Sequence, residues 1–277
     1  MPRAAGHAAG IGGLYFAYFA YVGLFSPYLS LYLAGIGMTI AQIGLLMAVP
    51  QVLRIVGPPF WGWLADRGGS GAGLLRISSA LACASALALA LSGWAGWPGG
   101  AALAAAPGLR FGVLFAVLAA LFFFTAAQMP IAETMAMRAV GGDTGRYGRL
   151  RVWGSVGFIV GVVGIGPVLD RHGVSGLPWW VAGLLALLTL VALRLPAVAA
   201  APRARASVSI GQRLAEPRVR AFFVSAFLML FAHAALYAFF SLYLAARGYS
   251  KTAIGLVWAL GVLAEIAVFW LQRGLFQ

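Results

Sequence analysis

Residues 30–45 read SLYLAGIGMTIAQIGL, and residues 241–256 repeat the pattern as SLYLAARGYSKTAIGL. The two segments align without a gap: SLYLA recurs intact, Gly37 matches Gly248, and the letters IGL return in register. A gapless match that continues through the start of a second apolar run is hard to obtain by chance, even in a chain rich in Ala and Leu. The repeat predicts a protein built from two homologous halves.

Long apolar runs surround both copies of the repeat. The 277 residues are 62% hydrophobic and 9% charged, whereas soluble domains carry about 25% charged residues. About 20 consecutive apolar residues cross the hydrocarbon core as a helix, because a helix satisfies its own backbone hydrogen bonds there. We therefore predict an all-α membrane protein with eight spans: Gly12–Gly35, Ala41–Leu64, Leu74–Gly93, Phe111–Arg138, Val152–Asp170, Pro178–Pro196, Val219–Ala246 and Thr252–Gln272.

The basic residues predict the orientation of these spans. The chain holds 19 Lys and Arg against 6 Asp and Glu, a net charge of +13. Fourteen of the basic residues lie at the N-terminus, in the loops after spans two, four and six, and in the tail; four lie on the opposite side, and Arg54 lies within a span. Since cytoplasmic loops carry the excess of Lys and Arg, we expect a multi-pass protein of a bacterial-type inner membrane with a cytoplasmic N-terminus. Its surroundings are then the lipid bilayer, and no nucleic-acid partner is expected.

The loop after span six divides the chain. Residues 197–218 are rich in Ala, Pro and Arg, and we predict a cytoplasmic linker there. An N-terminal six-helix bundle would occupy residues 1–196, and residues 219–277 would form the first two helices of a second bundle. Two six-helix halves need twelve spans, so the chain is also open to interpretation as a truncated fragment without transport activity.

Two ionisable residues at mid-span predict a cavity. A charge near the membrane centre costs about 2.5–3.5 kcal/mol on insertion scales, so such residues mostly line aqueous cavities or pair with one another. The offset of the repeat places Arg54 of span two and Glu265 of span eight at equivalent positions. We expect both side chains to face a central cavity, although an ion pair that only holds helices together is the alternative.

Three further ionisable residues lie in or beside the spans. We expect Glu133 of span four and Arg151 at the entry of span five to approach each other across their hairpin, as a structural pair or as part of a site. His233 lies within span seven, with Tyr237 one turn further on the same face. The histidine is either a hydrogen-bonded packing residue or a group that exchanges protons.

Aromatic side chains follow one face of span one. Tyr18, Tyr21, Phe25 and Tyr28 are spaced three and four residues apart. Such a face serves either helix packing or contact with an apolar or aromatic solute. We also expect prolines to interrupt the first two helices, at Pro27, Pro50, Pro58 and Pro59.

No pattern in the sequence indicates an enzyme. The chain has no His-Glu-x-x-His helix, no phosphate-binding glycine loop and no cluster of His and Cys for a metal. Cys83 is the only cysteine, so no intramolecular disulfide forms. We therefore expect no catalytic residue, no metal and no cofactor.

Several motifs resemble the major facilitator superfamily. Residues Gly62 to Arg67 read GWLADR, similar to the G-x-x-x-D-R signature that this superfamily carries between its second and third spans. The stretches GIGMTIAQIGLL, VLRIVGP, PIAETMAMRA and YGRLRVWGSVGFIVG resemble the phenylpropionate permease family, which is close to the oligosaccharide–proton symporters. The resemblance covers nearly all of residues 12–272 and implies two pseudo-symmetric helix bundles. It also implies a gate in which Gly62, Asp66 and Arg67 take part.

The resemblance also implies roles for single residues. Glu133, Arg151 and Glu265 match positions that bind the sugar in the oligosaccharide symporters, whereas Phe158 replaces a tryptophan that stacks on the sugar ring. Arg54 and His233 match the phenylpropionate permeases better.

We therefore expect proton-coupled symport of a small aromatic or other organic acid by alternating access. A sugar or nucleoside symporter is the alternative. In this prediction Arg54, Arg151 and Glu133 bind the substrate, together with the rings of Tyr21, Tyr28, Phe158 and Tyr237. The coupling proton is carried by Glu265 and His233.

Overall fold

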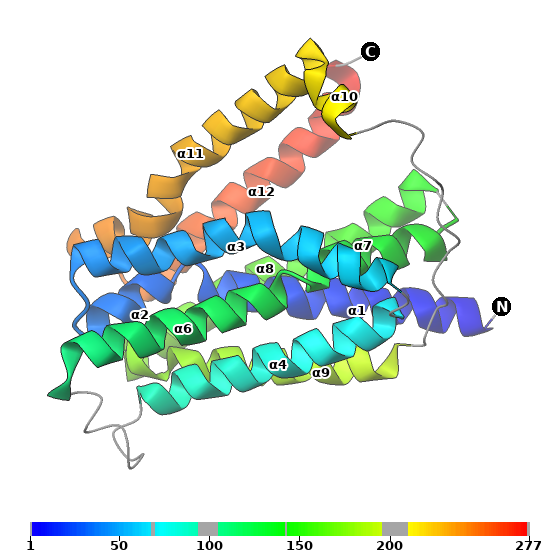
Figure 1. The fold of residues 1–277 in the computed structure, drawn as a ribbon. Coiled ribbons are helices and arrows are strands. Elements are labelled where there is room, and N and C mark those ends of the chain that lie inside the picture. The colour runs from blue at the N-terminus through cyan, green and yellow to red at the C-terminus, as the bar shows by residue number, and fades with distance from the viewer. Residues whose placement is uncertain (1, 68–69, 94–104, 142, 196–209, 276–277) are drawn as a thin grey trace.

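The computed structural model describes residues 2–67, 70–93, 105–141, 143–195 and 210–275. These residues form helices joined by short turns, without any strand (Figure 1). A short 3-10 turn at Val174–Gly176 precedes α9. The helices are α1 (Pro2–Phe25), α2 (Leu29–Gly35), α3 (Ile40–Asp66), α4 (Gly71–Ser92), α6 (Pro107–Thr125), α7 (Gln128–Ala139), α8 (Thr144–His172), α9 (Leu177–Arg194), α10 (Ile210–Ala215), α11 (Pro217–Ala246) and α12 (Lys251–Leu275).

The described residues contain eight helical segments that are long and apolar enough to cross a membrane. Most begin and end within a few residues of the predicted spans, so the prediction of eight spans is confirmed. The fifth begins well before the predicted Val152, at Gly145. The physical reason is a helix cap: Asp143 Oδ1 accepts hydrogen bonds from the backbone N–H groups of Gly145 at 2.9 Å and Arg146 at 3.0 Å. Helix α8 therefore continues through its arginine-rich first turns, which hydropathy alone had excluded.

Proline interrupts span one but not span two. Helix α1 ends at Phe25 and α2 begins at Leu29, on either side of Pro27, as predicted. Helix α3 runs without a break from Ile40 to Asp66 with three prolines inside it, so the interruption predicted for span two is wrong. In the membrane no water is present to bond the backbone N–H and C=O groups on either side of a proline. These groups therefore keep their helical hydrogen bonds, and the helix continues.

Span four contains a break that was not predicted. Helix α6 ends at Thr125 and α7 begins at Gln128. Pro130 has no N–H to donate to the carbonyl of Ala126 four residues earlier, which removes one helical hydrogen bond at this point. The break changes the direction of the chain between the two halves of the span (Figure 1).

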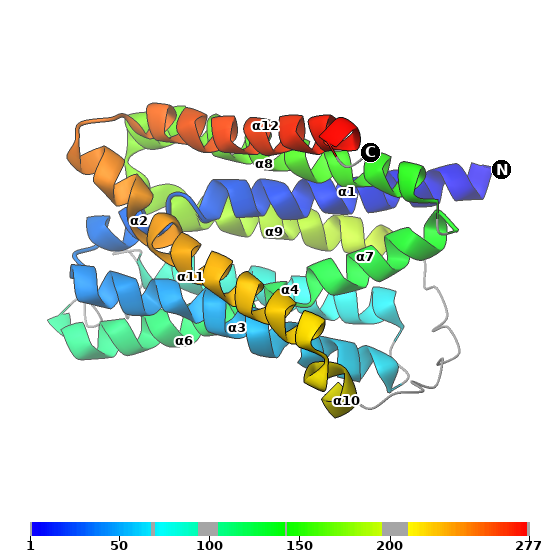
Figure 2. The same ribbon diagram turned by 90° about the horizontal axis from the view of Figure 1, so that it is seen from above.

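Glycines allow α1 and α8 to pack backbone against backbone. A Cβ atom on Gly157 would lie 2.2 Å from the carbonyl oxygen of Phe16, and one on Gly161 would lie 2.3 Å from that of Ala20. Neither contact is possible for a larger residue, and small residues four apart are a common helix interface in membranes. As a result α1 lies in the centre of the first bundle, between α8 and α9 (Figure 2).

The two copies of the repeat contain the same turn. Gly37 and Gly248 both have φ of +85°, a left-handed conformation that glycine adopts without strain. The next helix is then capped in each copy by a side-chain hydroxyl: Thr39 caps α3, and Ser250 accepts from the N–H of Ala253 at 3.1 Å in α12. The equivalence predicted from the sequence therefore extends to the backbone.

Helices α11 and α12 meet the first six spans at one end only. There α12 packs along α8 and α11 contacts α2 and α3, and toward their other ends both helices diverge from the rest (Figure 1). The predicted linker at 197–218 lies mostly outside the described residues, and its described part forms α10 and the start of α11. The division into 1–196, linker and 219–277 stays a prediction.

Candidate functional site

A cavity lies between the first bundle and α11. Its volume is about 70 Å³, which is space for several water molecules, since a single water needs about 10–15 Å³. The walls come from α1, α2, α3 and α6, with one side chain from α11. The lining includes Tyr18, Tyr21, Phe25, Arg54, Phe122 and Tyr237.

One wall of the cavity is a chain of aromatic rings. The rings of Tyr18 and Tyr21 meet edge to face with centroids 6.2 Å apart, and Tyr21 stacks on Phe25 at 5.8 Å. Phe25 in turn stacks on Phe122 of α6 at 5.9 Å. The spacing of three and four residues along α1 therefore serves helix packing, and contact of these rings with a solute stays a prediction. The rings pack against α6, and part of their surface faces the cavity.

Arg54 supplies positive charge to the same cavity. Its side chain is exposed, and the Nη1 donor reaches Gln51 Oε1 only at 3.4 Å, longer than a typical hydrogen bond. In the described part of the chain no carboxylate pairs with Arg54, so the guanidinium retains donors for another acceptor. Trp61, two turns along α3, donates its indole N–H to the carbonyl of Phe123 at 2.9 Å and ties α3 to α6. This contact helps to fix the helix that carries Arg54.

Glu133 and Arg151 do not form an ion pair among the described residues, and their role as part of a site stays a prediction. The Arg151 guanidinium instead lies over the ring of Phe19, 4.3 Å from its centroid, and Glu133 is exposed on α7. An aromatic face attracts a cation, and the position of Phe19 beside α8 was not visible in the sequence. Glu133 and Arg151 both lie within electrostatic range of Tyr18. Neither residue lines the cavity.

Two other predicted substrate residues lie away from the cavity. Phe158 is half-buried in the α1–α8 interface, where its carbonyl oxygen would lie 2.3 Å from a Cβ on Gly23. Tyr28 is fully buried after the Pro27 break, and its hydroxyl is shared between the carbonyl oxygens of Val162 at 3.0 Å and Lys251 at 2.9 Å. The structure thus brings Tyr21, Arg54 and Tyr237 together and leaves Phe158 and Tyr28 outside.

The two residues predicted to carry a proton lie on α11 and α12. His233 Nδ1 is 2.8 Å from the carbonyl oxygen of Met229, an acceptor, so this nitrogen carries hydrogen and Nε2 is left as the basic position. The His233 ring lies 6.1 Å from that of Tyr237, which lines the cavity and stacks on Trp258 of α12 at 5.8 Å. Glu265 is exposed on α12, two helical turns beyond Trp258 and therefore on the same face.

The GWLADR signature of the predicted gate lies at the C-terminal end of α3. Gly62 is exposed, with nothing within 4 Å of an added Cβ. Asp66 is the last residue of the helix, and the Arg67 guanidinium lies over the ring of Trp63 at 4.0 Å. The gating role of these residues stays a prediction.

Several cavity residues had not been singled out in the sequence. Gln51 carried a signal, because it is an uncharged polar residue inside an apolar span and one turn before Arg54. Phe122 and Thr125 carried none, since Phe122 is one of many apolar residues in span four and threonine is common in membrane helices. Among the described residues, no three His, Cys, Asp or Glu gather as metal ligands would.

Comparison with known proteins gives concordant matches. The sequence model of the MFS_1 like family matches residues 10–277. The "Probable 3-phenylpropionic acid transporter" of Escherichia coli (strain K12) is 32% identical over 273 residues, which cover 95% of this chain and 66% of the relative. Maltose permease of Geobacillus stearothermophilus is 31% identical over 255 residues, covering 91% of this chain and 60% of the relative.

The solved structure of the nucleoside transporter NupG has the same fold. It matches with a TM-score of 0.69 at 17% sequence identity, covering 96% of this chain and 68% of NupG. At that identity the likeness shows the fold alone. The chain spans 60% to 66% of the length of the two curated relatives.

Proposed function

The chain belongs to the MFS_1 like family of the major facilitator superfamily, and on this premise we propose that it carries a small aromatic carboxylate across a membrane together with protons. The family and the fold are those of transporters, which are not enzymes. We place the protein in the inner membrane with the N-terminus in the cytoplasm, as the arginine distribution predicts. Substrate, proton coupling and orientation are all part of the proposal.

The observation that carries the proposal is the pairing of a ring-lined wall with Arg54 in one cavity. Tyr18, Tyr21 and Phe25 offer apolar ring surface on α1, and Arg54 offers a guanidinium from α3. A guanidinium binds a carboxylate through charge-assisted hydrogen bonds, often two in parallel, and aromatic rings pack edge to face or offset against another ring. An aromatic acid uses both features at once, whereas an uncharged sugar leaves the charge of Arg54 without a counterion.

A proton route is offered by α11 and α12. Nε2 of His233 is free to accept a proton, and Tyr237 connects the His233 ring to the cavity. Glu265 lies on the same face of α12 as Trp258, the stacking partner of Tyr237. A carboxylate substrate that enters with one proton adds no net charge to the cavity, which reduces the electrostatic cost of closing the site around it.

A sugar is the second candidate, and one relative favours it. Maltose permease of Geobacillus stearothermophilus is 31% identical to this chain. Glu133 and Arg151, which resemble sugar-binding positions of the oligosaccharide symporters, both interact electrostatically with Tyr18, a residue that lines the cavity. Nucleosides are the third class, because NupG, whose solved structure shares the fold, is a nucleoside transporter.

Competition for uptake separates these candidates. Membrane vesicles that contain the protein are given radiolabelled 3-phenylpropionate with an inward proton gradient, and unlabelled 3-phenylpropionate, maltose or uridine is added in excess. We expect uptake that only the aromatic acid suppresses. Uptake of labelled maltose or uridine with no uptake of the acid would replace the proposed substrate class. Vesicles with the Arg54→Gln variant serve as the matched control, because this substitution keeps a hydrogen-bonding amide and removes the charge.

A further inference from the structure

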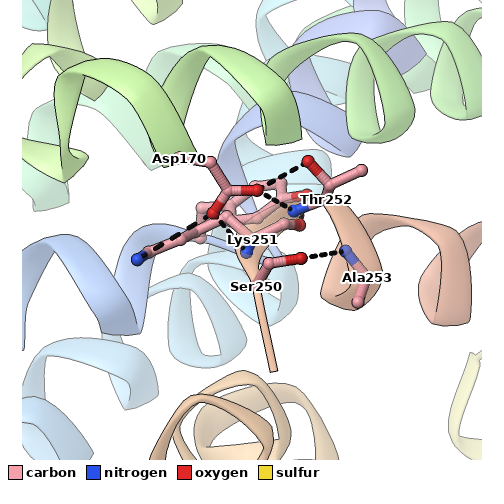
Figure 3. A network of polar contacts seen from close by, with 6 residues as sticks. Asp170, Ser250, Lys251, Thr252 and Ala253 are labelled. Atoms are coloured by element: carbon pink, nitrogen blue, oxygen red, sulfur yellow. Dashed lines mark hydrogen bonds and ion pairs between the residues drawn. The ribbon is translucent and has the colours of Figure 1, made fainter. Parts of the chain in front are cut away.

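The carboxylate of Asp170 joins the two bundles at the end of the molecule opposite the arginine-rich loops. Asp170 lies near the C-terminal end of α8, and its Oδ1 accepts a hydrogen bond from the N–H of Lys251 at 2.7 Å. Its Oδ2 accepts from the N–H of Thr252 at 2.9 Å and from the Thr252 hydroxyl at 2.6 Å (Figure 3). The Lys251 ammonium is 4.0 Å from the same carboxylate. We call this set of contacts the Asp170 cap.

Helix α12 has a second cap that comes from its own bundle. The first four N–H groups of a helix have no partner within it, and here Ser250 Oγ accepts from the N–H of Ala253 at 3.1 Å (Figure 3). If α12 moved away from α8, Ser250 would keep this contact and Asp170 would lose all of its contacts to α12. The Asp170 cap therefore exists only while the two bundles touch at this end, and α12 still begins in a capped turn when they separate.

The helices that the Asp170 cap joins are otherwise in direct backbone contact. A Cβ atom on Gly166 would lie 2.7 Å from Thr252 Cα, and one on Gly255 would lie 2.5 Å from the carbonyl oxygen of Val162. The hydroxyl of Tyr28, buried at the same place, donates to Val162 as well. The same hydroxyl reaches the carbonyl oxygen of Lys251 in α12 at 2.9 Å, so Tyr28 and the close backbone contacts together leave no gap between α8 and α12 at this end.

The opposite end of the same two bundles is open. Helices α11 and α12 diverge from the first bundle there (Figure 1), and most of their residues toward that end, Glu265 among them, are exposed. At the Asp170 end the two bundles are thus in contact, α12 with α8 and α11 with α2 and α3, and at the end of the arginine-rich loops they are apart. With the predicted orientation, this is a state that faces the cytoplasm.

We infer that Asp170 is a positioning residue for transport, whose carboxylate holds the outer end of the cavity closed by capping α12 across the bundle interface. The inference rests on the proposed transport function. Because the carboxylate meets the positive end of α12 only in the closed state, its removal shifts the equilibrium toward an outward-open state without touching the substrate wall.

Access to the cavity from outside measures this equilibrium directly. Cys83 is replaced by Ser to remove the only cysteine, and Met47→Cys is introduced as a reporter. Met47 is buried, lines the cavity, and lies about 10 Å along α3 from its outer end. Intact spheroplasts are treated with a membrane-impermeant maleimide, which reaches the reporter only through the outer end. We expect Asp170→Ala to raise the labelling rate by roughly five- to tenfold, the equivalent of losing one helix cap.

Asp143→Ala is the matched control. It removes a carboxylate cap of the same kind, but Asp143 caps α8 within a single bundle, so labelling of the reporter stays at the rate of the unsubstituted chain. An unchanged rate in Asp170→Ala, or an equal rise in both variants, would overturn the inference. The readout does not require transport, so it stands apart from a failure of the proposed substrate.

A covalent replacement tests the same contact if Asp170→Ala folds poorly. Asp170→Cys and Thr252→Cys place two thiols where the side chains are in hydrogen-bond contact. Oxidation should cross-link them, slow labelling of the reporter at least tenfold, and be reversed by dithiothreitol. Labelling that stays equally fast with the cross-link in place would show that the outer end does not open here, and the inference would fail.

Discussion

The charge of Arg54 is the feature on which the choice of substrate depends, and removing it has a calculable effect. Arg54→Gln keeps an amide that can donate hydrogen bonds and removes the positive charge. The hydrogen bond from Arg54 Nη1 to Gln51 Oε1 is long, at 3.4 Å, so the substitution disturbs little of the fold. Thermal unfolding of the purified variant should therefore match that of the unsubstituted protein to within a few degrees.

The expected loss of affinity follows from the kind of bond that is removed. A hydrogen bond to a charged group contributes about 1.5–3 kcal/mol net, and 1.4 kcal/mol corresponds to a tenfold change in Kd. Binding of 3-phenylpropionate should weaken by roughly 10- to 100-fold in Arg54→Gln. Arg54→Lys keeps the charge and loses the planar fork, so its loss should be smaller.

The assay compares an acid with its uncharged amide. Binding of labelled 3-phenylpropionate and 3-phenylpropionamide is measured by equilibrium dialysis on the purified protein, with Arg110→Gln as a control at an arginine outside the cavity. The acid should lose affinity in Arg54→Gln, whereas the amide should bind both proteins alike. Equal losses for the acid and the amide, or an effect of similar size in Arg110→Gln, would refute the assignment of the carboxylate to Arg54.

Three other substitutions test the remaining parts of the account. Glu265→Gln should abolish accumulation driven by a proton gradient while exchange of labelled for unlabelled substrate continues; gradient-driven accumulation at the normal rate would remove Glu265 from the proton route. Tyr21→Leu removes a ring from the cavity wall and should weaken binding of both acid and amide by about 3- to 10-fold, as expected for one aromatic contact; a loss confined to the acid would place Tyr21 near the carboxylate instead. Gly157→Ala forces a methyl group to within 2.2 Å of the Phe16 carbonyl oxygen, and in thermal unfolding assays it should lower the free energy of unfolding by about 2 kcal/mol or more. Gly164→Ala is the control, because nothing lies within 4 Å of an added Cβ there, and it should not destabilise the protein. A Gly157→Ala variant as stable as the unsubstituted protein would contradict the close α1–α8 contact.

Hydropathy and the repeat predicted most of the fold because they depend on local chemistry. An apolar run of membrane length has no alternative to a helix, so the eight spans were found with small errors at their ends. Gly37 and Gly248 were paired by the repeat alone, and their shared positive φ explains why glycine recurs at this position. The effect of the prolines in α3 was predicted wrongly, and the break before Gln128 was missed. Whether a proline interrupts a helix depends on which neighbouring groups bond to the carbonyl oxygen that the proline leaves without a donor.

The site was harder to predict because its contacts join residues far apart in the chain. Arg54 was found because a charge inside an apolar span is visible in the sequence, Tyr21 because it belongs to an aromatic face with helical spacing, and Tyr237 because it lies one turn from His233. The contact of Arg151 with the ring of Phe19 was missed, because it is set by how α1 packs on α8. Asp170 attracted no attention for the same reason: it read as the end of a span, and its partner lies on a helix of the other bundle.

Accumulation of substrate against its gradient is the most direct test of the account. The purified chain is reconstituted into sealed vesicles, and uptake of labelled 3-phenylpropionate is followed after a proton gradient, acidic outside, is imposed. Weak acids cross lipid unaided in their neutral form, so empty vesicles and vesicles with Arg54→Gln are measured in parallel. The account predicts faster, saturable accumulation with the unsubstituted chain that a protonophore collapses. Uptake that is no faster than in empty vesicles, or that does not respond to the protonophore, would contradict it.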